Sequence, residues 1–492
     1  MTQTENIHSI LDAPLQRHPQ ADSLQRQLYL RLRTAILQQQ FPAGCRLPGS
    51  RGLAETLAIS RNTVLSVYEQ LTAEGFLVAD KRGTVVASVS SQQSTSMATA
   101  DIRYSRRIVS MQGDTRMPSK EQLFRVGIPA LAQFPIKAWQ KALEHAVSSH
   151  APTALNYGDP LGEWSLRQEI AQHLAISRGM RCKPEQVVIT EGAQAALNLC
   201  VQLFSNAGEI GWIENPGYQG ARTAMRCGEL HLHPMPVDAS GIVVNAADWE
   251  THPPALIYTT PSHQYPTGSV LSVQRRLALI HQAKQHQAWI IEDDYDSEYR
   301  HSGVPVVAMQ GLVDDAPVLY VGSFSKTLFP ALRLGFLVLP ERVMSQLHVD
   351  IANIVRGGHL HAQLALRWWM QSGQYSRHLT RMRKLYRDRQ MALKAALAEN
   401  FFIPHEILGG AAGLHLTLRL PAEYSDHHIA QAAKAYGMAV SALSAFACNG
   451  CDPQNGLVLG YGNTAIDQYA GLLQRLTTIA MACSNLGVKK AT

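Results

Sequence analysis

The stretch YVGSFSKTLFPALRLGFLVLP, residues 320–340, places Lys326 in a run of small and apolar residues that predicts a buried strand. Burial disfavours the charged form of a lysine, so its pKa falls, and the neutral amine can form a Schiff base with an aldehyde. Ser323 and Ser325 flank this lysine, and Arg333, whose guanidinium suits phosphate oxygens, follows seven residues later. We therefore expect Lys326 to hold an aldehyde cofactor.

Length and composition set the broad class of the chain. At 492 residues it exceeds the usual size of one core, so we expect two or more domains. A hydrophobic fraction of 46%, a charged fraction of 17%, a polar start and the lack of a membrane-length apolar run predict a cytoplasmic protein without membrane contact. The seven cysteines are scattered and odd in number, which fits a reducing compartment. Cys448 and Cys451 form a C-x-x-C without a second pair, so we expect no metal site.

A serine-rich stretch, SVSSQQSTSM at residues 88–97, reads as a flexible linker. It separates a small N-terminal unit from a large C-terminal one. We expect a DNA-binding domain at 20–88, a linker at 89–119 and a cofactor-binding domain at 120–486. Residues 1–110 carry 12 basic against eight acidic residues, a bias that points weakly towards nucleic acid.

The N-terminal unit has the pattern of a winged helix-turn-helix. Leucine and isoleucine recur every four residues over 24–36, which predicts a helix, and a short helix at 50–57 is separated by two residues from another that begins after Ser60. The second of such a pair enters the major groove of DNA by its first residues, here Ser60, Arg61, Asn62 and Thr63. Two short β runs around Lys81 and Arg82 predict a hairpin wing with a basic tip. The alternative is a three-helix domain in which the polar helix start is only a cap.

This unit resembles the winged helix of the GntR family of bacterial regulators. The resemblance rests on GCRLPGSRGLAETLAISRNTVLSVYEQLTAEGFL, residues 44–77. It implies that Arg51, Arg61 and Thr63 contact double-stranded DNA.

Three further clusters in the C-terminal unit bear on the cofactor. In VVITEGAQAALNLCVQLF, residues 187–204, a strand is followed by a helix whose first turn, at Ala193 and Gln194, presents free N–H groups to a phosphate; an ordinary strand-to-helix turn is the alternative. In AWIIEDDYDSEY, residues 288–299, acidic residues follow a buried strand, an arrangement also typical of a Mg²⁺ site. TTPSHQYPTG, residues 259–268, is a polar loop after a strand.

Pyridoxal 5'-phosphate (PLP) requires these parts together: an amine, a phosphate seat, a carboxylate at the pyridine nitrogen and a flat partner for the ring. We expect Ala193, Gln194, Ser323 and Arg333 to hold the phosphate. Asp293 would pair with the pyridine nitrogen, Tyr295 would bond the phenolic oxygen, and Tyr218 would stack on the ring.

The C-terminal unit resembles the fold-type I aminotransferases over about residues 120–485. The motifs that carry the resemblance are NYGDPLG, TEGAQAAL, ENPGYQG, YPTG, EDDYDSEY and SFSKTLFPALRLG. It implies an α/β fold, Lys326 as the Schiff-base lysine, and the roles given above for Asp293, Ser323, Arg333 and Tyr218. It also implies that Tyr157 reaches the phosphate of a neighbouring subunit, and thus a head-to-tail homodimer.

A winged helix joined to such a domain, with TPSHQYPTG and EDDYDSEYR, resembles the MocR/GabR regulators. That resemblance implies a transcriptional regulator that senses PLP, an amino compound, or both. The alternative is an active PLP-dependent aminotransferase with an accessory N-terminal domain.

The sequence departs from the aminotransferase pattern at two places. Tyr265 stands before PTG where those enzymes place an asparagine, and either His263 or Gln264 could substitute for it. Asn455 stands in the region of the arginine that clamps the substrate carboxylate; Arg419 is a candidate replacement, although an exposed strand arginine is the more common reading. Because positioning supplies much of the catalytic rate, we expect weak transamination at most.

Overall fold

The computed structural model describes residues 14–18, 20–80, 83–88, 105, 107, 122–149, 154–303 and 306–488. The chain forms two compact units, residues 1–103 and 104–492, and each is described by itself. None of the helices within the described ranges is long and apolar enough to cross a membrane.

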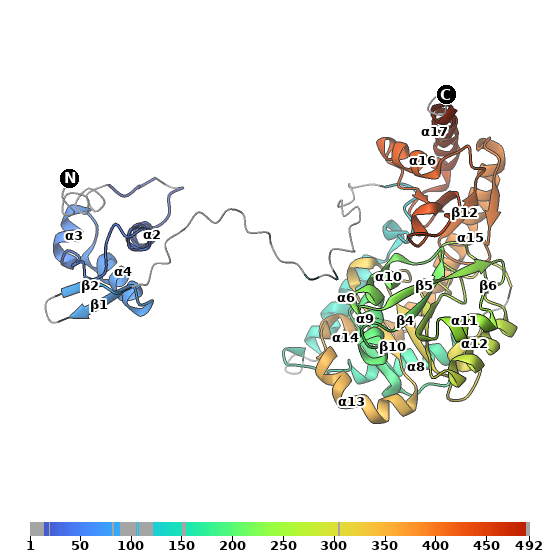
Figure 1. The fold of residues 1–492 in the computed structure, drawn as a ribbon, viewed down its shortest axis with the longest axis horizontal. Helices are drawn as coiled ribbons and strands as arrows, with labels where there is room; N and C mark the ends of the chain where they lie inside the picture. Colours follow the sequence, from blue (N-terminus) through green and yellow to red (C-terminus); the bar gives the residue numbers. More distant parts are fainter. Residues whose placement is uncertain are drawn as a thin grey trace. The chain divides into compact units, whose positions relative to one another are not determined.

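The N-terminal unit, blue in Figure 1, packs three helices against a two-stranded hairpin. Ser60 ends the turn before the third helix, and its Oγ accepts from the backbone N–H of Thr63, so the helix begins where the sequence predicts. Leu28, Leu32 and Val64 are fully buried between the helices. The elements are α2 (Leu24–Leu37), α3 (Ser50–Thr56), α4 (Arg61–Ala73), β1 (Leu77–Asp80) and β2 (Gly83–Val86).

The C-terminal unit is built on an eight-stranded mixed sheet in the order β3-β10-β9-β8-β7-β4-β5-β6. Strands β4, β5, β7, β8 and β9 are parallel, so their carboxyl ends meet at one edge, while β10 runs antiparallel to β3 and β9. The bounds are β3 (Val187–Thr190), β4 (Ile210–Asn215), β5 (His231–Asp238), β6 (Gly241–Ile242), β7 (Pro254–Thr259), β8 (Trp289–Asp294), β9 (Val318–Ser323) and β10 (Gly335–Val338).

Helices cover both faces of this sheet because side chains of a strand alternate between its faces. Val188 and Val321 pack against α9, α10 and α13, whereas Val187 and Tyr320 belong to the core on the opposite face, with α6, α8 and α14. The helices are α6 (Ile136–Ser148), α8 (Trp164–Arg178), α9 (Ala193–Phe204), α10 (Gln219–Cys227), α11 (Ala246–Thr251), α12 (Val273–Gln285), α13 (Glu341–Val355) and α14 (Leu360–Gln371).

A smaller four-stranded antiparallel sheet, in the order β11-β12-β14-β13, completes the unit with three helices (Figure 1). Its strands are β11 (Glu406–Leu408), β12 (His415–Arg419), β13 (Ser441–Ala442) and β14 (Gly456–Gly460). Its helices are α15 (Gln374–Asn400), α16 (Asp426–Ala433) and α17 (Tyr469–Val488). The basic stretch 377–390 lies on α15, where Leu379 and Met382 are buried.

The stretch 320–340 differs from the single buried strand that its composition predicts. It folds as β9, a turn that carries Lys326, a short 3₁₀ turn (Pro330–Leu332) and β10, which returns antiparallel to β9. Pro330 has no N–H for a ladder, and Arg333 adopts a left-handed φ of 51°, so the strand cannot continue through them. The break leaves Lys326 at the carboxyl end of β9.

Candidate functional site

A cavity of about 310 Å³ opens at the carboxyl ends of β7, β8 and β9. Such edges of parallel strands are the usual ligand sites of α/β sheets. The cavity brings together eight of the nine residues that the sequence predicts for PLP: Lys326, Asp293, Tyr295, Ser323, Arg333, Tyr218, Ala193 and Gln194. The ninth, Tyr157, does not line this cavity and is 99% exposed.

The Lys326 side chain lies half-buried at the cavity wall, and desolvation lowers the pKa of its amine, although the carboxylates of Asp296 and Asp293 oppose the shift. Gly127 lies against it with a φ of 77°, and a Cβ added there would lie 3.0 Å from the lysine Nζ. A side chain at position 127 would therefore crowd the amine. The lowered pKa favours the neutral, nucleophilic form of the amine.

Asp293 lies on β8 and points to the α9 side of the sheet. Its Oδ2 accepts a 2.7 Å hydrogen bond from the Tyr258 hydroxyl, whereas its buried Oδ1 has no hydrogen-bond partner among the described residues. Burial raises the pKa of Asp293 to about 7. A buried carboxylate oxygen without a donor is costly, and a positively charged N–H in the cavity would satisfy it. The pyridine nitrogen of PLP, in its protonated form, fits this requirement.

The opposite part of the cavity is a seat for an anion. Gly192, with a φ of 83°, precedes the first turn of α9, where Ala193 and Gln194 leave their N–H groups without helical partners. The Arg333 guanidinium donates to the Glu191 carbonyl at 3.0 Å and lies 3.5 Å from the position of a Cβ on Gly192. Ser323 adds a hydroxyl at the end of β9. These donors line one cavity, and together they suit a phosphate group.

The three consecutive acidic residues of β8 do not form a metal cluster. Glu292 accepts from the backbone N–H groups of Met309 (2.9 Å) and Gln310 (3.2 Å), on the face opposite Asp293. Asp294 forms a buried 2.8 Å ion pair with Arg178. Because strand side chains alternate, neighbouring carboxylates are held by different groups. Within the described ranges, no three His, Cys, Asp or Glu residues are grouped to hold a metal ion.

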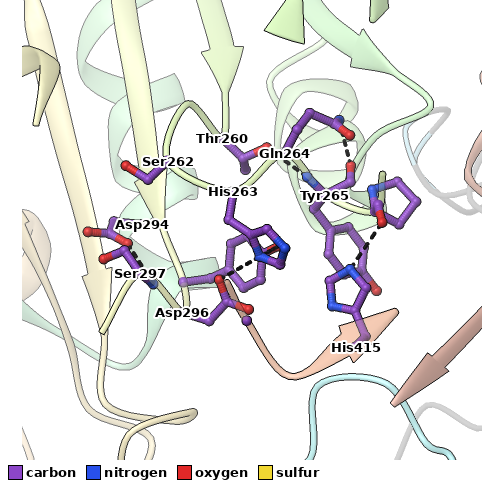
Figure 2. Close-up of polar contacts among 12 residues, drawn as sticks. Thr260, Ser262, His263, Gln264, Tyr265, Asp294, Asp296, Ser297 and His415 are labelled. Atoms are coloured by element: carbon purple, nitrogen blue, oxygen red, sulfur yellow. Dashed lines mark hydrogen bonds and ion pairs between the residues drawn. The ribbon is translucent and has the colours of Figure 1, made fainter. Parts of the chain in front are cut away.

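The polar loop 259–268 meets the cavity through Tyr265, and neither His263 nor Gln264 lines it. The Gln264 amide donates to the Glu214 carboxylate at 3.1 Å and to the Pro216 carbonyl at 2.9 Å, and so holds the loop in place. Nδ1 of His263 lies 2.9 Å from the Tyr295 hydroxyl and 2.9 Å from Oδ1 of Asp296. Figure 2 shows the imidazole and the Asp296 carboxylate turned towards each other. Of the two open substitutes for asparagine, only His263 contacts Tyr295.

Among the cavity residues that sequence reasoning missed are Gly127, Tyr258, Asp296 and His415. Asp296 stands within the EDDYDSEY motif, so the sequence did offer a signal for it. His415 comes from β12 of the smaller sheet and donates from Nε2 to the Pro266 carbonyl at 3.0 Å (Figure 2). Burial lowers its pKa to about 4. Nothing local in the sequence marks His415 or Gly127 as neighbours of Lys326.

Neither candidate for a carboxylate clamp lies at the cavity. The Asn455 amide donates to the carbonyls of Leu420, Pro421 and Tyr424, which makes it a structural residue. Arg419 is half-exposed at the end of β12 and pairs with Glu406 at 2.8 Å.

The N-terminal unit places its predicted DNA-contacting residues at the start of α4 and on α3. Arg51, Ser60, Arg61 and Asn62 are exposed, and Thr63 is half-buried. The Arg61 Nε donates to the Ser50 hydroxyl at 3.3 Å, and the Ser60 and Thr63 hydroxyls lie 2.8 Å apart. Ser60 therefore caps the helix, as the alternative of a plain three-helix domain also expects, and it is exposed on the surface as well. Lys81 and Arg82 lie outside the described residues.

Fold and cavity together define a winged helix-turn-helix joined to a fold-type I aminotransferase-like domain, and the comparisons agree. Residues 24–86 match the model of bacterial regulatory proteins of the gntR family, and residues 123–456 match aminotransferase class I and II. The chain belongs to the MocR/GabR family and is a transcriptional regulator with an aminotransferase-like domain.

Two regulators align with this chain over nearly their whole length. The probable rhizopine catabolism regulatory protein MocR of Rhizobium meliloti is 38% identical over 89% of this chain and 90% of its own. The pyridoxine biosynthesis transcriptional regulator PdxR of Corynebacterium glutamicum is 29% identical over 95% of this chain and 98% of its own. Among solved structures, a multiple substrate aminotransferase of Thermococcus profundus superposes with a TM-score of 0.70 at 24% identity, over 78% of this chain and 98% of that one, which shows the shared fold.

Proposed function

We propose that the chain binds PLP through Lys326 and that this cavity, filled by PLP alone or with an amino compound, controls how the winged helix binds its operator. The observation that carries the proposal is Oδ1 of Asp293, a buried oxygen without a donor among the described residues, in one cavity with a half-buried lysine and an anion seat. Few ligands other than PLP need all three groups.

Each residue of the cavity would have one task. The lowered pKa of Lys326 favours the reactive neutral amine, and Asp293 would accept from the ring nitrogen. Arg333, Ser323 and the N–H groups of Ala193 and Gln194 would hold the phosphate, Tyr218 would pack against the ring, and Tyr295 would face the phenolic oxygen. Bound PLP would supply an aldehyde that combines reversibly with amines, which suits a sensor of amino compounds.

The exposure of Tyr157 supports a head-to-tail homodimer. A tyrosine that is 99% exposed, beside a Leu155 that is 82% exposed, leaves apolar surface in water. In the proposed dimer Tyr157 leaves its own subunit and reaches the phosphate in the partner's cavity. The cavity would then be complete only in the dimer.

DNA binding would use the start of α4 in the major groove, with Arg51, Ser60, Arg61, Asn62 and Thr63 at bases or phosphates and Lys81 and Arg82 on the wing. A regulator of this kind would work in the cytoplasm, where DNA is accessible; its seven cysteines, all free, fit a reducing compartment. The name of PdxR, a relative that regulates pyridoxine biosynthesis, supports PLP as a signal. We expect transamination to be weak, because neither Asn455 nor Arg419 lies at the cavity, where it could bind the substrate carboxylate.

Titration of the cofactor-free protein with PLP, followed by absorbance, tests the proposal. The parent should gain a visible band at one PLP per chain, and Lys326→Ala should not. Lys183→Ala is the matched control, since Lys183 is 63% exposed and pairs with Glu341 on the surface. A band that persists in Lys326→Ala, or is absent from the parent, would overturn the proposal.

A further inference from the structure

The Tyr295 hydroxyl contacts a buried pair, His263 and Asp296, to which the proposed function gives no role. His263 and Asp296 are each 2% exposed, and Nδ1 of His263 lies 2.9 Å from both the Asp296 Oδ1 and the Tyr295 hydroxyl. Tyr295 and Asp296 also line the cavity beside Lys326. A change in this pair would therefore reach the cofactor through Tyr295.

The protons carried by His263 and Asp296 decide which way the Tyr295 hydroxyl points. A carboxylate only accepts hydrogen bonds, and a single imidazole nitrogen carries either a proton or a lone pair. When Asp296 is ionised, Nδ1 must carry the proton that it donates to Oδ1, and it has no lone pair left to accept from Tyr295. The tyrosine can then only receive from the imidazole. Its own proton is left to point into the cavity.

Close packing fixes the pair in this arrangement. Gly413, with a φ of 86°, lies directly against it, and a Cβ there would overlap both the His263 ring and the Asp296 carboxylate. His415, on β12, faces His263 with the ring centroids 5.1 Å apart. Because burial lowers the pKa of His415 to about 4, it adds no positive charge near neutral pH. Other titratable groups that face Asp296 are Lys326, Tyr265, His301 and Tyr461.

We propose that His263 and Asp296 are positioning residues that hold the Tyr295 hydroxyl as a hydrogen-bond donor into the cavity, towards the phenolic oxygen of bound PLP. The proposal rests on the proposed function, since it requires PLP in the cavity. The pair would take over the work of the asparagine whose place Tyr265 occupies. His263 itself need not touch the cofactor.

The pH at which the bound chromophore changes colour tests this role. A donor to the phenolic oxygen stabilises its anionic form, so loss of the donor should raise the titration midpoint, by about one pH unit or more. We expect Tyr295→Phe and His263→Phe to raise it similarly, and the double variant to shift no further than Tyr295→Phe alone. His405→Phe is the matched control, because His405 contacts the Ile403 carbonyl and is no part of the pair, and it should leave the midpoint unchanged.

Asp296→Asn supplies an independent arm should His263→Phe fail to fold. Loss of its negative charge near Lys326 alone would lower the midpoint, whereas loss of the Tyr295 donor raises it. The positioning role therefore predicts that Asp296→Asn shifts the midpoint further upward in the parent than in the Tyr295→Phe background, where only the loss of charge acts. Equal shifts in both backgrounds, or an unchanged midpoint in His263→Phe, would overturn the inference. A parent without any chromophore would instead overturn the proposed function.

Discussion

At the scale of single residues, Asp293 lowers the folding stability of the cofactor-free protein near neutral pH but would strengthen the binding of PLP. Burial raises its pKa to about 7, above the value of about 3.9 in an unfolded chain. The stability that it contributes is thus complete below pH 4 and is lost as the pH rises through 7. A positively charged group bound at Oδ1 would offset this loss of stability.

Asp293→Asn should separate the two effects. At pH 8 the cofactor-free variant should be more stable than the parent, by as much as a few kcal/mol, because a neutral amide replaces a buried charge. Its Tm should also vary less between pH 5 and 8, while its affinity for PLP falls at least tenfold through loss of a charge-assisted bond. Thermal melts and PLP titrations measure both. Asp238→Asn is the control: its pKa is lowered by bonding to Arg275, so no gain is expected. A destabilised Asp293→Asn protein at pH 8 would contradict the account.

The residues of the site were predictable from sequence where a local motif carries them. Lys326, Arg333 and Asp293 stand in short stretches whose chemistry is readable, and the structure brings them to one cavity. His415 was not predictable, since its contact with Pro266 joins residues 149 apart in the chain. Neither was Gly127, because only the folded chain shows what lies against it.

At the scale of elements, the turn between β9 and β10 and the segment before α6 form the pocket of the lysine. Composition predicted a strand over 320–340 because apolar residues dominate it, and the error arose where Pro330 and Arg333 interrupt the ladder. The helix starts at Ser60 and Ala193 were predictable, since a cap residue and a glycine mark them. Backbone conformation at element ends thus decides how the amine is presented.

Gly127→Ala tests whether the approach of the backbone to Lys326 matters. The added methyl would lie 3.0 Å from Nζ, so we expect PLP incorporation to fall at least tenfold. Gly208→Ala is the matched control: its φ of 86° imposes a similar backbone cost, about 1–2 kcal/mol, but nothing lies within 4 Å of the new methyl. Absorbance titration of both variants measures the effect. Equal losses in the two would show that backbone strain alone is responsible.

At the scale of the whole molecule, the account requires a cavity shared between two subunits. The sequence predicted this only through family resemblance, since Tyr157 stands in a loop and no motif around it indicates which residues it would contact. Mixed dimers test it. When Lys326→Ala and Tyr157→Ala chains are combined, a shared cavity regenerates one site with both residues intact.

The mixed dimer should therefore bind about one PLP per dimer with parental affinity, whereas each variant alone binds weakly or not at all. Absorbance titration after co-refolding, with two separable affinity tags to isolate the mixed dimer, gives the measurement. If Tyr157 acts within its own subunit, no native site is regenerated, and the dimer proposal fails.

The most direct test of the central claim is fluorescence anisotropy of a labelled duplex that the protein itself has enriched from a random-sequence pool. The duplex is titrated with parent and Lys326→Ala protein, without PLP, with PLP, and with PLP plus a panel of amino compounds; Arg61→Ala serves as the binding-deficient control. We expect at least one addition to shift the parent's Kd for DNA several-fold and the Lys326→Ala protein to bind DNA without that shift. An identical Kd for the parent under every condition, or the same shift in Lys326→Ala, would contradict the claim that the cavity controls DNA binding.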